Sequence, residues 1–240
     1  MPANKVEKLK YRILAVEALR AVRRLLPYSY RQLSREINFD ETLLARYSTG
    51  ITVPSYEQAE ELIAALRKSL DPARITLMKA GEYKGLLDLV PILSDPFMLK
   101  LLSLEFYERF RGRDITKILV PETSGITLAT ALALTFDSSL VIARRTKDNP
   151  MIEYVEEHII EPPAIKNIFY IPKGSLKKED KVLVVDDIVQ TGFTLAVMKK
   201  LVERAGAKLQ GVATIVVVGD EWRRRVDIDK VEALITISKV

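Results

Sequence analysis

The chain has 240 residues, of which 48% are hydrophobic and 29% charged. This apolar content is enough for a buried core, and the length suits one large domain or two modest ones. The absence of cysteine excludes a disulfide scaffold, thiolate metal sites and a thiol nucleophile. No uncharged apolar run is long enough to span a membrane. We therefore expect a cytoplasmic protein that has no membrane partner.

The positive charge is unevenly distributed along the chain. The formal net charge is +5, yet residues 1–35 alone carry nine Lys or Arg side chains and only two Glu. A concentrated positive segment indicates a polyanionic partner, and a solvated basic helix surface is the alternative.

Apolar residues at helical spacing predict four helices in the first part of the chain, at 5–26, 29–37, 40–48 and 55–70. Ser29 and Asp40 are suitable N-cap residues for the second and third of these helices. Pro27 and Pro54 prevent continuity between neighbouring helices. We expect an all-α domain over residues 1–72.

The pattern changes over residues 73–240. Helices are predicted at 86–93, 96–110, 126–134 and 194–205. Between and after them lie runs rich in β-branched residues, at 118–120, 140–142, 181–185, 213–218 and 233–237. Strands that alternate with helices predict an α/β domain with a central, mainly parallel sheet flanked by helices.

The strongest chemical signal is VLVVDDIVQTGFT at residues 182–194, a buried strand, two acids and a loop that opens a helix. A helix N-terminus after a glycine turn offers unpaired backbone N–H groups to a phosphate. Gly192 allows close approach of the backbone, and the hydroxyls of Thr191 and Thr194 add donors. Asp186 and Asp187 would repel phosphate, so they suit the vicinal hydroxyls of a ribose, with or without Mg²⁺.

This run resembles the phosphoribosyl pyrophosphate (PRPP) signature of type I phosphoribosyltransferases. The resemblance implies that Asp186 and Asp187 hold the ribose hydroxyls. It also implies that the 5-phosphate is bound by Val189, Gln190, Thr191, Gly192, Phe193 and Thr194.

Two further segments resemble parts of orotate phosphoribosyltransferases. ILVPETSGITLATALAL resembles a loop that binds pyrophosphate through backbone amides, which implies roles for Glu122, Thr123, Ser124 and Gly125. VIARRTKDNP resembles the start of the flexible catalytic hood, which implies that Arg144, Arg145 and Lys147 clamp pyrophosphate. The hood's Glu is missing and Asn149-Pro150 replaces its His-Gly, which argues against catalysis. The alternative is an ordinary charged loop.

SYRQLSREINFDETLLARYSTGITVPS is similar to repressor-type helix-turn-helix domains, with Ser34 at the helix crossing and Asn38 in the turn. The expected core residues are Leu33, Ile37, Phe39, Leu44 and Tyr47. The resemblance implies a recognition helix that presents Glu41, Thr42, Leu43 and Arg46 to the major groove. It implies contacts to the DNA backbone from Tyr30, Arg31, Gln32 and Ser48. The alternative is a small helical bundle used for dimerisation.

The order of the two segments resembles the archaeal orotate phosphoribosyltransferase-like transcriptional regulators of the GfcR type. This implies a homodimer that binds palindromic double-stranded DNA and uses its phosphoribosyltransferase fold to sense PRPP or a related phosphoribosyl nucleotide, and it leaves residual transferase activity open. It assigns no catalytic residue and no metal ligand, and the expected ligand is PRPP, with or without Mg²⁺. The alternatives are an active orotate- or purine-type phosphoribosyltransferase with an appended DNA-binding module, and an RNA-binding protein. We interpret the single histidine, His158, as a structural or surface residue.

Overall fold

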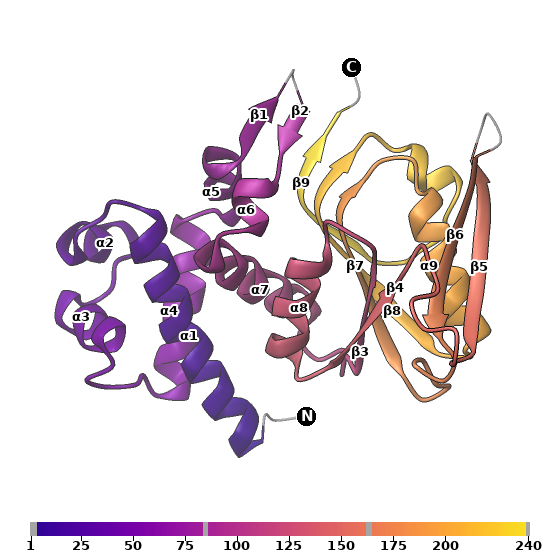
Figure 1. Cartoon of the computed structure of the whole chain (residues 1–240). Helices are drawn as coiled ribbons and strands as arrows, with labels where there is room; N and C mark the ends of the chain where they lie inside the picture. The colour runs from indigo at the N-terminus through magenta and orange to yellow at the C-terminus, as the bar shows by residue number, and fades with distance from the viewer. Residues whose placement is uncertain (1–3, 84–85, 162–164, 239–240) are drawn as a thin grey trace. The chain divides into compact units, whose positions relative to one another are not determined.

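A computed structural model describes residues 4–83, 86–161 and 165–238 (Figure 1). The chain packs into two compact units that divide between Glu105 and Phe106. The predicted domain boundary after residue 72 stays a prediction. No helix in the described part of the chain is long and apolar enough to cross a membrane.

The first unit begins with the four expected helices and a fifth that was not expected. They are α1 (Lys5–Leu25), α2 (Tyr30–Ile37), α3 (Glu41–Thr49), α4 (Tyr56–Ser69) and α5 (Pro72–Lys79). The predicted caps are confirmed, because Ser29 accepts a hydrogen bond from the Gln32 amide and Asp40 accepts one from the Leu43 amide. The unexpected α5 has Pro at its first position, where the missing N–H costs nothing, and Asp71 caps it.

The helix predicted at 86–93 is partly wrong. Residues Leu86–Asp88 form strand β2, which pairs antiparallel with β1 (Gly81–Tyr83), and only Val90–Leu93 are helical, as α6. A short apolar run fits either period, so spacing alone does not separate strand from helix here. The Asp88 carboxylate accepts a hydrogen bond from the Val90 amide at 2.9 Å, which favours a helix start after the strand. The next helix, α7 (Pro96–Phe110), has the predicted bounds.

The second unit contains a five-stranded parallel sheet in the order β4-β3-β7-β8-β9. Its strands are β3 (Lys117–Pro121), β4 (Ser139–Ala143), β7 (Lys181–Val189), β8 (Lys208–Val218) and β9 (Val231–Ile237). Helix α8 (Ile126–Phe136) connects β3 to β4, and α9 (Phe193–Arg204) connects β7 to β8. These connections run in opposite directions along the sheet, and Figure 1 shows the two helices on opposite sides of it. The expected fold class is confirmed.

An antiparallel ribbon of β5 (Tyr154–Glu161) and β6 (Ile165–Pro172) was not predicted. Strand β5 contains three glutamates, and only Ile168–Ile171 of β6 form an apolar run, so the ribbon as a whole lacks the uniform apolar pattern of buried parallel strands. The single histidine, His158, is exposed on β5 and pairs in register with Ile168.

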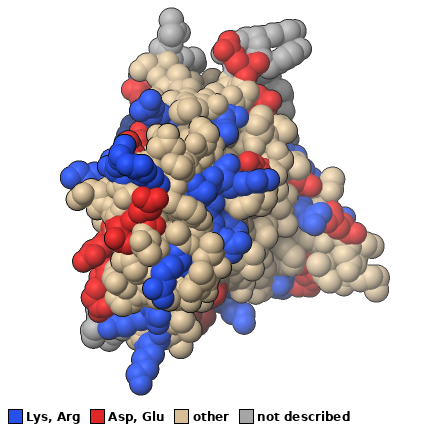
Figure 2. Space-filling view, turned by 90° about the vertical axis from the view of Figure 1, so that its left-hand side faces the viewer, with Lys and Arg blue, Asp and Glu red and all other residues tan. Residues whose placement is uncertain are grey.

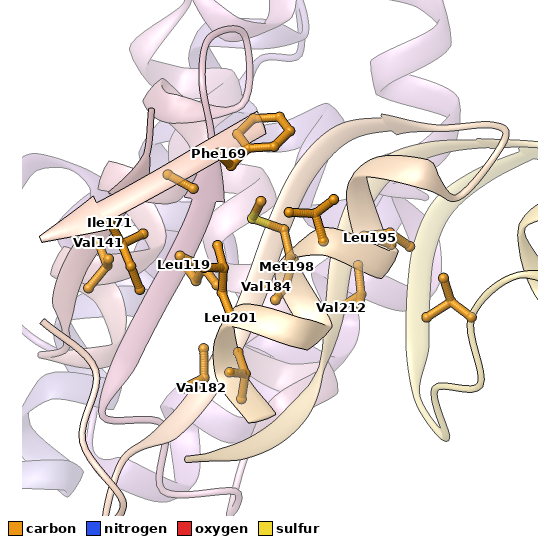
Figure 3. Close-up of a cluster of buried hydrophobic side chains, with 14 of the residues drawn as sticks. Leu119, Val141, Phe169, Ile171, Val182, Val184, Leu195, Met198, Leu201 and Val212 are labelled. Carbon is orange, nitrogen blue, oxygen red and sulfur yellow. The ribbon is translucent and has the colours of Figure 1, made fainter. Parts of the chain in front are cut away.

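The main core of the second unit lies between the sheet and α9 (Figure 3). Leu119, Val184 and Val212 contribute from the strands, and Met198 from the helix, each buried to at least 99%. Phe169 of β6 joins the same cluster, so the ribbon is anchored over the helix. Burial of each large apolar side chain stabilises the fold by roughly 1.5–3 kcal/mol. This packing fixes the end of β7 relative to the start of α9.

Candidate functional site

The loops of interest all follow the carboxyl ends of parallel strands. Residues 122–125 follow β3, 144–147 follow β4, 190–192 follow β7, and 219–225 follow β8. Strands β3 and β7 are neighbours, and their helices leave toward opposite faces of the sheet. This reversal point is where open α/β sheets bind ligands. The topology therefore gathers the predicted phosphoribosyl-binding residues at one edge.

Two adjacent carboxylates end the apolar part of β7. Asp186 is buried, with 8% of its surface exposed, whereas Asp187 is half-buried. Burial raises the pKa of Asp186 well above its ordinary value, and the neighbouring charge of Asp187 raises it further. The amide of Asp187 donates to Asp186 Oδ1, and that of Ile188 donates to Asp187 Oδ1, both at 3.0 Å. Asp187 is thus the more accessible hydrogen-bond acceptor of the pair.

The loop after β7 turns into α9 at Gly192. This residue has a φ of +79°, a conformation that side chains other than glycine rarely adopt, and no side chain caps the helix. The amides of the first turn have no carbonyl partner within the helix, as at any helix start. Thr191 and Thr194 are half-buried beside these amides, Val189 is buried and Gln190 is exposed. The helix start thus supplies N–H donors a few residues after the two carboxylates in the chain.

The loop after β3 lies against the Asp pair. A Cβ atom at Gly125 would stand 3.4 Å from both the Asp186 Cα and the Asp187 amide nitrogen. The peptide bond between Glu122 and Thr123 is cis, and the Thr123 and Ser124 side chains are exposed. The structure thus places the loop after β3 against the backbone of the two aspartates.

The cationic segment after β4 meets the same loop through its backbone. The amide of Arg145 donates to Glu122 Oε2 at 2.9 Å. The Arg144 side chain forms an ion pair with Asp148, and Lys147 Nζ lies 3.2 Å from Glu156 Oε2. The guanidinium carbon of Arg145 lies 4.7 Å from the centre of the Phe169 ring. The segment therefore contacts the loop after β3 through its backbone, while the side chains of Arg144 and Lys147 form ion pairs with Asp148 and Glu156.

Residues 100–239 match the family model of the phosphoribosyl transferase domain. The chain belongs to this family. A xanthine phosphoribosyltransferase of Lacticaseibacillus casei is 34% identical over 51% of this chain and 65% of its own length. An adenine phosphoribosyltransferase of Triticum aestivum is 32% identical over 54% of this chain and 70% of its own length. The chain thus spans about two thirds of the curated relatives that it matches.

Solved structures of the family share the fold. An adenine phosphoribosyltransferase from Thermoanaerobacter pseudethanolicus superposes with a TM-score of 0.63 and 22% sequence identity, covering 69% of this chain and 99% of its own. The Saccharomyces cerevisiae adenine phosphoribosyltransferase, complexed with an imino-altritol bisphosphate and adenine, gives a TM-score of 0.61 at 24% identity. At this level of identity the similarity supports the fold alone.

Arg225 contacts the candidate site, although we did not assign it there from the sequence. It follows the short helix η1 (Glu221–Arg224). Its guanidinium donates a hydrogen bond to the carbonyl of Thr191. The neighbouring Trp222 is buried against Gly192. The sequence signal is a run of three arginines shortly after the apolar strand β8. Its relation to Thr191, 34 residues earlier, requires the fold.

The candidate nucleic-acid interface, α2 and α3, lies outside the residues that match the family. Asn38 adopts the left-handed conformation at the turn, and the Ser34 hydroxyl donates to the Phe39 carbonyl at 2.7 Å. Of the expected core, Leu33, Ile37, Leu44 and Tyr47 are buried and Phe39 is partly buried. The turn therefore has the predicted geometry.

The residues assigned to DNA differ in their surroundings. Arg31, Glu41, Thr42 and Arg46 are exposed, while Leu43 and Ser48 are partly buried. The side chain of Gln32 caps α2 by accepting from the Ser29 amide at 2.8 Å, and Tyr30 lies under the Arg23 guanidinium at 4.0 Å. Figure 2 views the side on which Figure 1 draws α2 and α3, and it shows Lys and Arg interspersed with Asp and Glu. The surface there has mixed charge.

Proposed function

We propose that the family domain binds PRPP and transfers its phosphoribosyl group to a purine base. The observation that carries this proposal is the Asp186–Asp187 pair, at the carboxyl end of β7 and in contact with the loop that contains Gly125. The purine enzymes among the relatives support a purine acceptor. This is the alternative that the sequence left open beside a sensor without activity.

In the proposed complex, the ribose hydroxyls donate hydrogen bonds to the carboxylates, and the half-buried Asp187 is the more accessible acceptor. The 5-phosphate binds the unpaired amides of residues 191–194, where the helix dipole favours an anion. The backbone of Thr123 and Ser124 faces the pyrophosphate. Carboxylates thus accept from the ribose hydroxyls, and backbone N–H groups donate to the phosphate oxygens.

The reaction is a displacement at C1 of the ribose. A ring nitrogen of the base forms a bond to C1, and the bond from C1 to the pyrophosphate oxygen breaks. Pyrophosphate leaves with the electron pair, and the nitrogen's proton is released. Arg144 and Lys147 stabilise the departing charge after exchanging their present partners, Asp148 and Glu156, for phosphate oxygens.

Mg²⁺ fits this arrangement as an ion that arrives with the ligand. No three potential metal-ligating side chains cluster among the residues that the structure describes. Mg²⁺ is commonly held by one or two carboxylates together with substrate phosphates, and Asp186 and Asp187 supply such carboxylates. When bound, the ion neutralises charge on the pyrophosphate.

The test is pyrophosphate release from PRPP with adenine, xanthine, hypoxanthine, guanine and orotate as acceptors. We expect turnover with at least one purine, and a loss of about a hundredfold in Asp187→Asn, as for removal of one electrostatic group in an active site. Asp227→Asn, which changes an exposed carboxylate elsewhere in the domain, is the control. Tight PRPP binding without turnover on any base would overturn the enzymatic proposal and support a ligand sensor.

A second candidate function is DNA binding by α2 and α3. In this case the protein would regulate genes of nucleotide or sugar metabolism, and PRPP bound to the family domain would change its affinity for DNA. The specific observation that favours it is the turn at Asn38, which leaves Thr42 and Arg46 exposed on α3. An exposed helix that begins at a three-residue turn can enter the major groove. A homodimer would present two such helices to a palindromic site.

Fluorescence anisotropy with labelled duplex from the gene's own upstream region tests this candidate, with and without PRPP and Mg²⁺. Sequence-selective binding that changes with PRPP supports the regulator, since only a ligand that prefers one state shifts the equilibrium. Absence of selective binding in every condition would overturn it and leave a helical dimerisation module.

A further inference from the structure

The loop between β7 and α9 has a second support, which comes from the segment after β8. The Arg225 guanidinium donates to the Thr191 carbonyl, and its central carbon lies 3.6 Å from the centre of the Phe193 ring. One side chain therefore contacts residues on both sides of Gly192. A guanidinium that stacks on a ring and donates to a carbonyl is fixed in orientation by the stacking as well as by the hydrogen bond.

The backbone that carries Arg225 is itself fixed. Trp222 is 3% exposed, and its carbonyl accepts hydrogen bonds from the amides of Arg225 and Val226, both at 3.0 Å. A Cβ atom at Gly192 would lie 2.8 Å from the Trp222 Cα, so the two segments touch backbone to backbone. Arg225 is thus presented to the loop from a buried and close-packed base, although its own side chain is exposed.

The hydrogen bond to Thr191 determines how the next amide is directed. The Thr191 carbonyl and the Gly192 N–H belong to one peptide unit, which is planar and trans, so the two groups point in opposite directions. When the carbonyl points to Arg225, the Gly192 N–H points away from it. Gly192 immediately precedes the first turn of α9, where the unpaired amides lie.

We propose that Arg225 is a positioning residue for the 5-phosphate of a phosphoribosyl ligand. It holds the Thr191–Gly192 peptide with its N–H directed to the phosphate, and its charge favours the phosphate dianion over the monoanion. This inference rests on the proposed PRPP-binding function. It adds a side chain outside the strand–loop–helix motif to a phosphate site otherwise made by that motif alone.

Binding of ribose 5-phosphate by isothermal titration calorimetry tests the proposal, because this ligand carries the phosphate without the pyrophosphate. We expect Arg225→Ala to weaken binding about tenfold, the usual effect of losing one charge-assisted hydrogen bond. Arg225→Lys retains the charge but not the planar stacking, so its affinity should lie between those of the wild type and Arg225→Ala. Arg224→Ala removes the same charge from the neighbouring exposed residue and should change affinity less than about twofold.

A pH series separates positioning of the phosphate from a general loss of structure. The second pKa of a phosphate is about 6, so affinity for the wild type should rise between about pH 5 and about pH 7.5. We expect a smaller rise in Arg225→Ala and an unchanged rise in Arg224→Ala. Thermal unfolding without ligand shows whether the variant remains folded.

Three results would overturn the inference. Equal affinities of Arg225→Ala and Arg224→Ala, when the wild type binds, would remove the role of Arg225 and leave the proposed function intact. An unchanged pH dependence in Arg225→Ala would show that its loss affects only the loop's stability. If the wild type bound neither ribose 5-phosphate nor PRPP, the proposed function would itself be wrong.

Discussion

The guanidinium of Arg67 holds the carboxylate of Glu105 with two hydrogen bonds, at 2.7 and 3.0 Å. Arg67 lies in the last turn of α4, and Glu105 lies on α7, 38 residues later. Glu105 is 4% exposed, so its carboxylate is almost wholly shielded from water. A bidentate pair of this kind fixes the orientation of the two helices as well as their distance. It joins the predicted helix-turn-helix region to the helix that leads into the family domain.

We expect Arg67→Ala to destabilise the first unit by about 2 kcal/mol. Removing one partner of a buried pair typically costs about 3–5 kcal/mol, and the partial exposure of Arg67 reduces this figure. Chemical denaturation followed by helical circular dichroism measures the change. Lys100→Ala is a matched control, because Lys100 joins α7 to α1 through an ion pair with Glu17 in which neither side chain is buried. A loss as small as that of the control would show that water already solvates Glu105.

Gly192→Ala should destabilise the protein by about 3 kcal/mol and reduce PRPP binding. About 1 kcal/mol comes from alanine at positive φ, and the rest from the clash of the new methyl group with the Trp222 backbone. Gly174→Ala is the control, because Gly174 has a similar φ of +83° but nothing within 4 Å of a Cβ atom. Thermal and chemical unfolding of both variants separates the two contributions. Equal losses would mean that the contact with Trp222 adjusts without cost.

Asp186→Asn should stabilise the protein without ligand at neutral pH while weakening PRPP binding. The pKa of Asp186 is raised in the folded state by burial and by Asp187, so the folded state binds a proton that the unfolded state releases above its ordinary pKa of 3.8. The wild type therefore loses stability as pH rises from this value through the raised pKa. The uncharged asparagine avoids that loss. Unfolding midpoints from acid to neutral pH measure the difference, and a constant difference at every pH would contradict the assignment.

Arg46→Ala should weaken binding to duplex DNA and leave PRPP binding unchanged. If Arg46 contacts a phosphate, the slope of the logarithm of affinity against the logarithm of salt concentration falls by about 0.9. Arg35→Ala, at an exposed position of α2 outside the predicted interface, is the control for loss of charge. Anisotropy at several salt concentrations gives both slopes. Equal effects of the two substitutions would indicate general electrostatic attraction to DNA rather than docking of α3.

The predictions of helices and strands were correct where a local sequence pattern was unambiguous. The caps at Ser29 and Asp40 act over three residues, and their side chains bond the amides expected from the sequence. The central strands β3 and β7 contain continuous apolar runs, the pattern typical of buried parallel strands. The ribbon of β5 and β6 escaped prediction because charged residues interrupt its apolar pattern. The strand at Leu86–Asp88 escaped it because so short an apolar run fits a helix equally well.

The sequence by itself determined the chemistry of the candidate site: two carboxylates, a glycine turn and a helix start in thirteen consecutive residues. It did so because a strand, its turn and the following helix are set by neighbouring residues. Tertiary structure alone decided that Gly125 lies against Asp186, and that Arg225 reaches Thr191. These contacts depend on the order of the strands in the sheet, which places the ends of β3, β7 and β8 side by side. Strand order results from the packing of helices on both faces, and no local pattern encodes it.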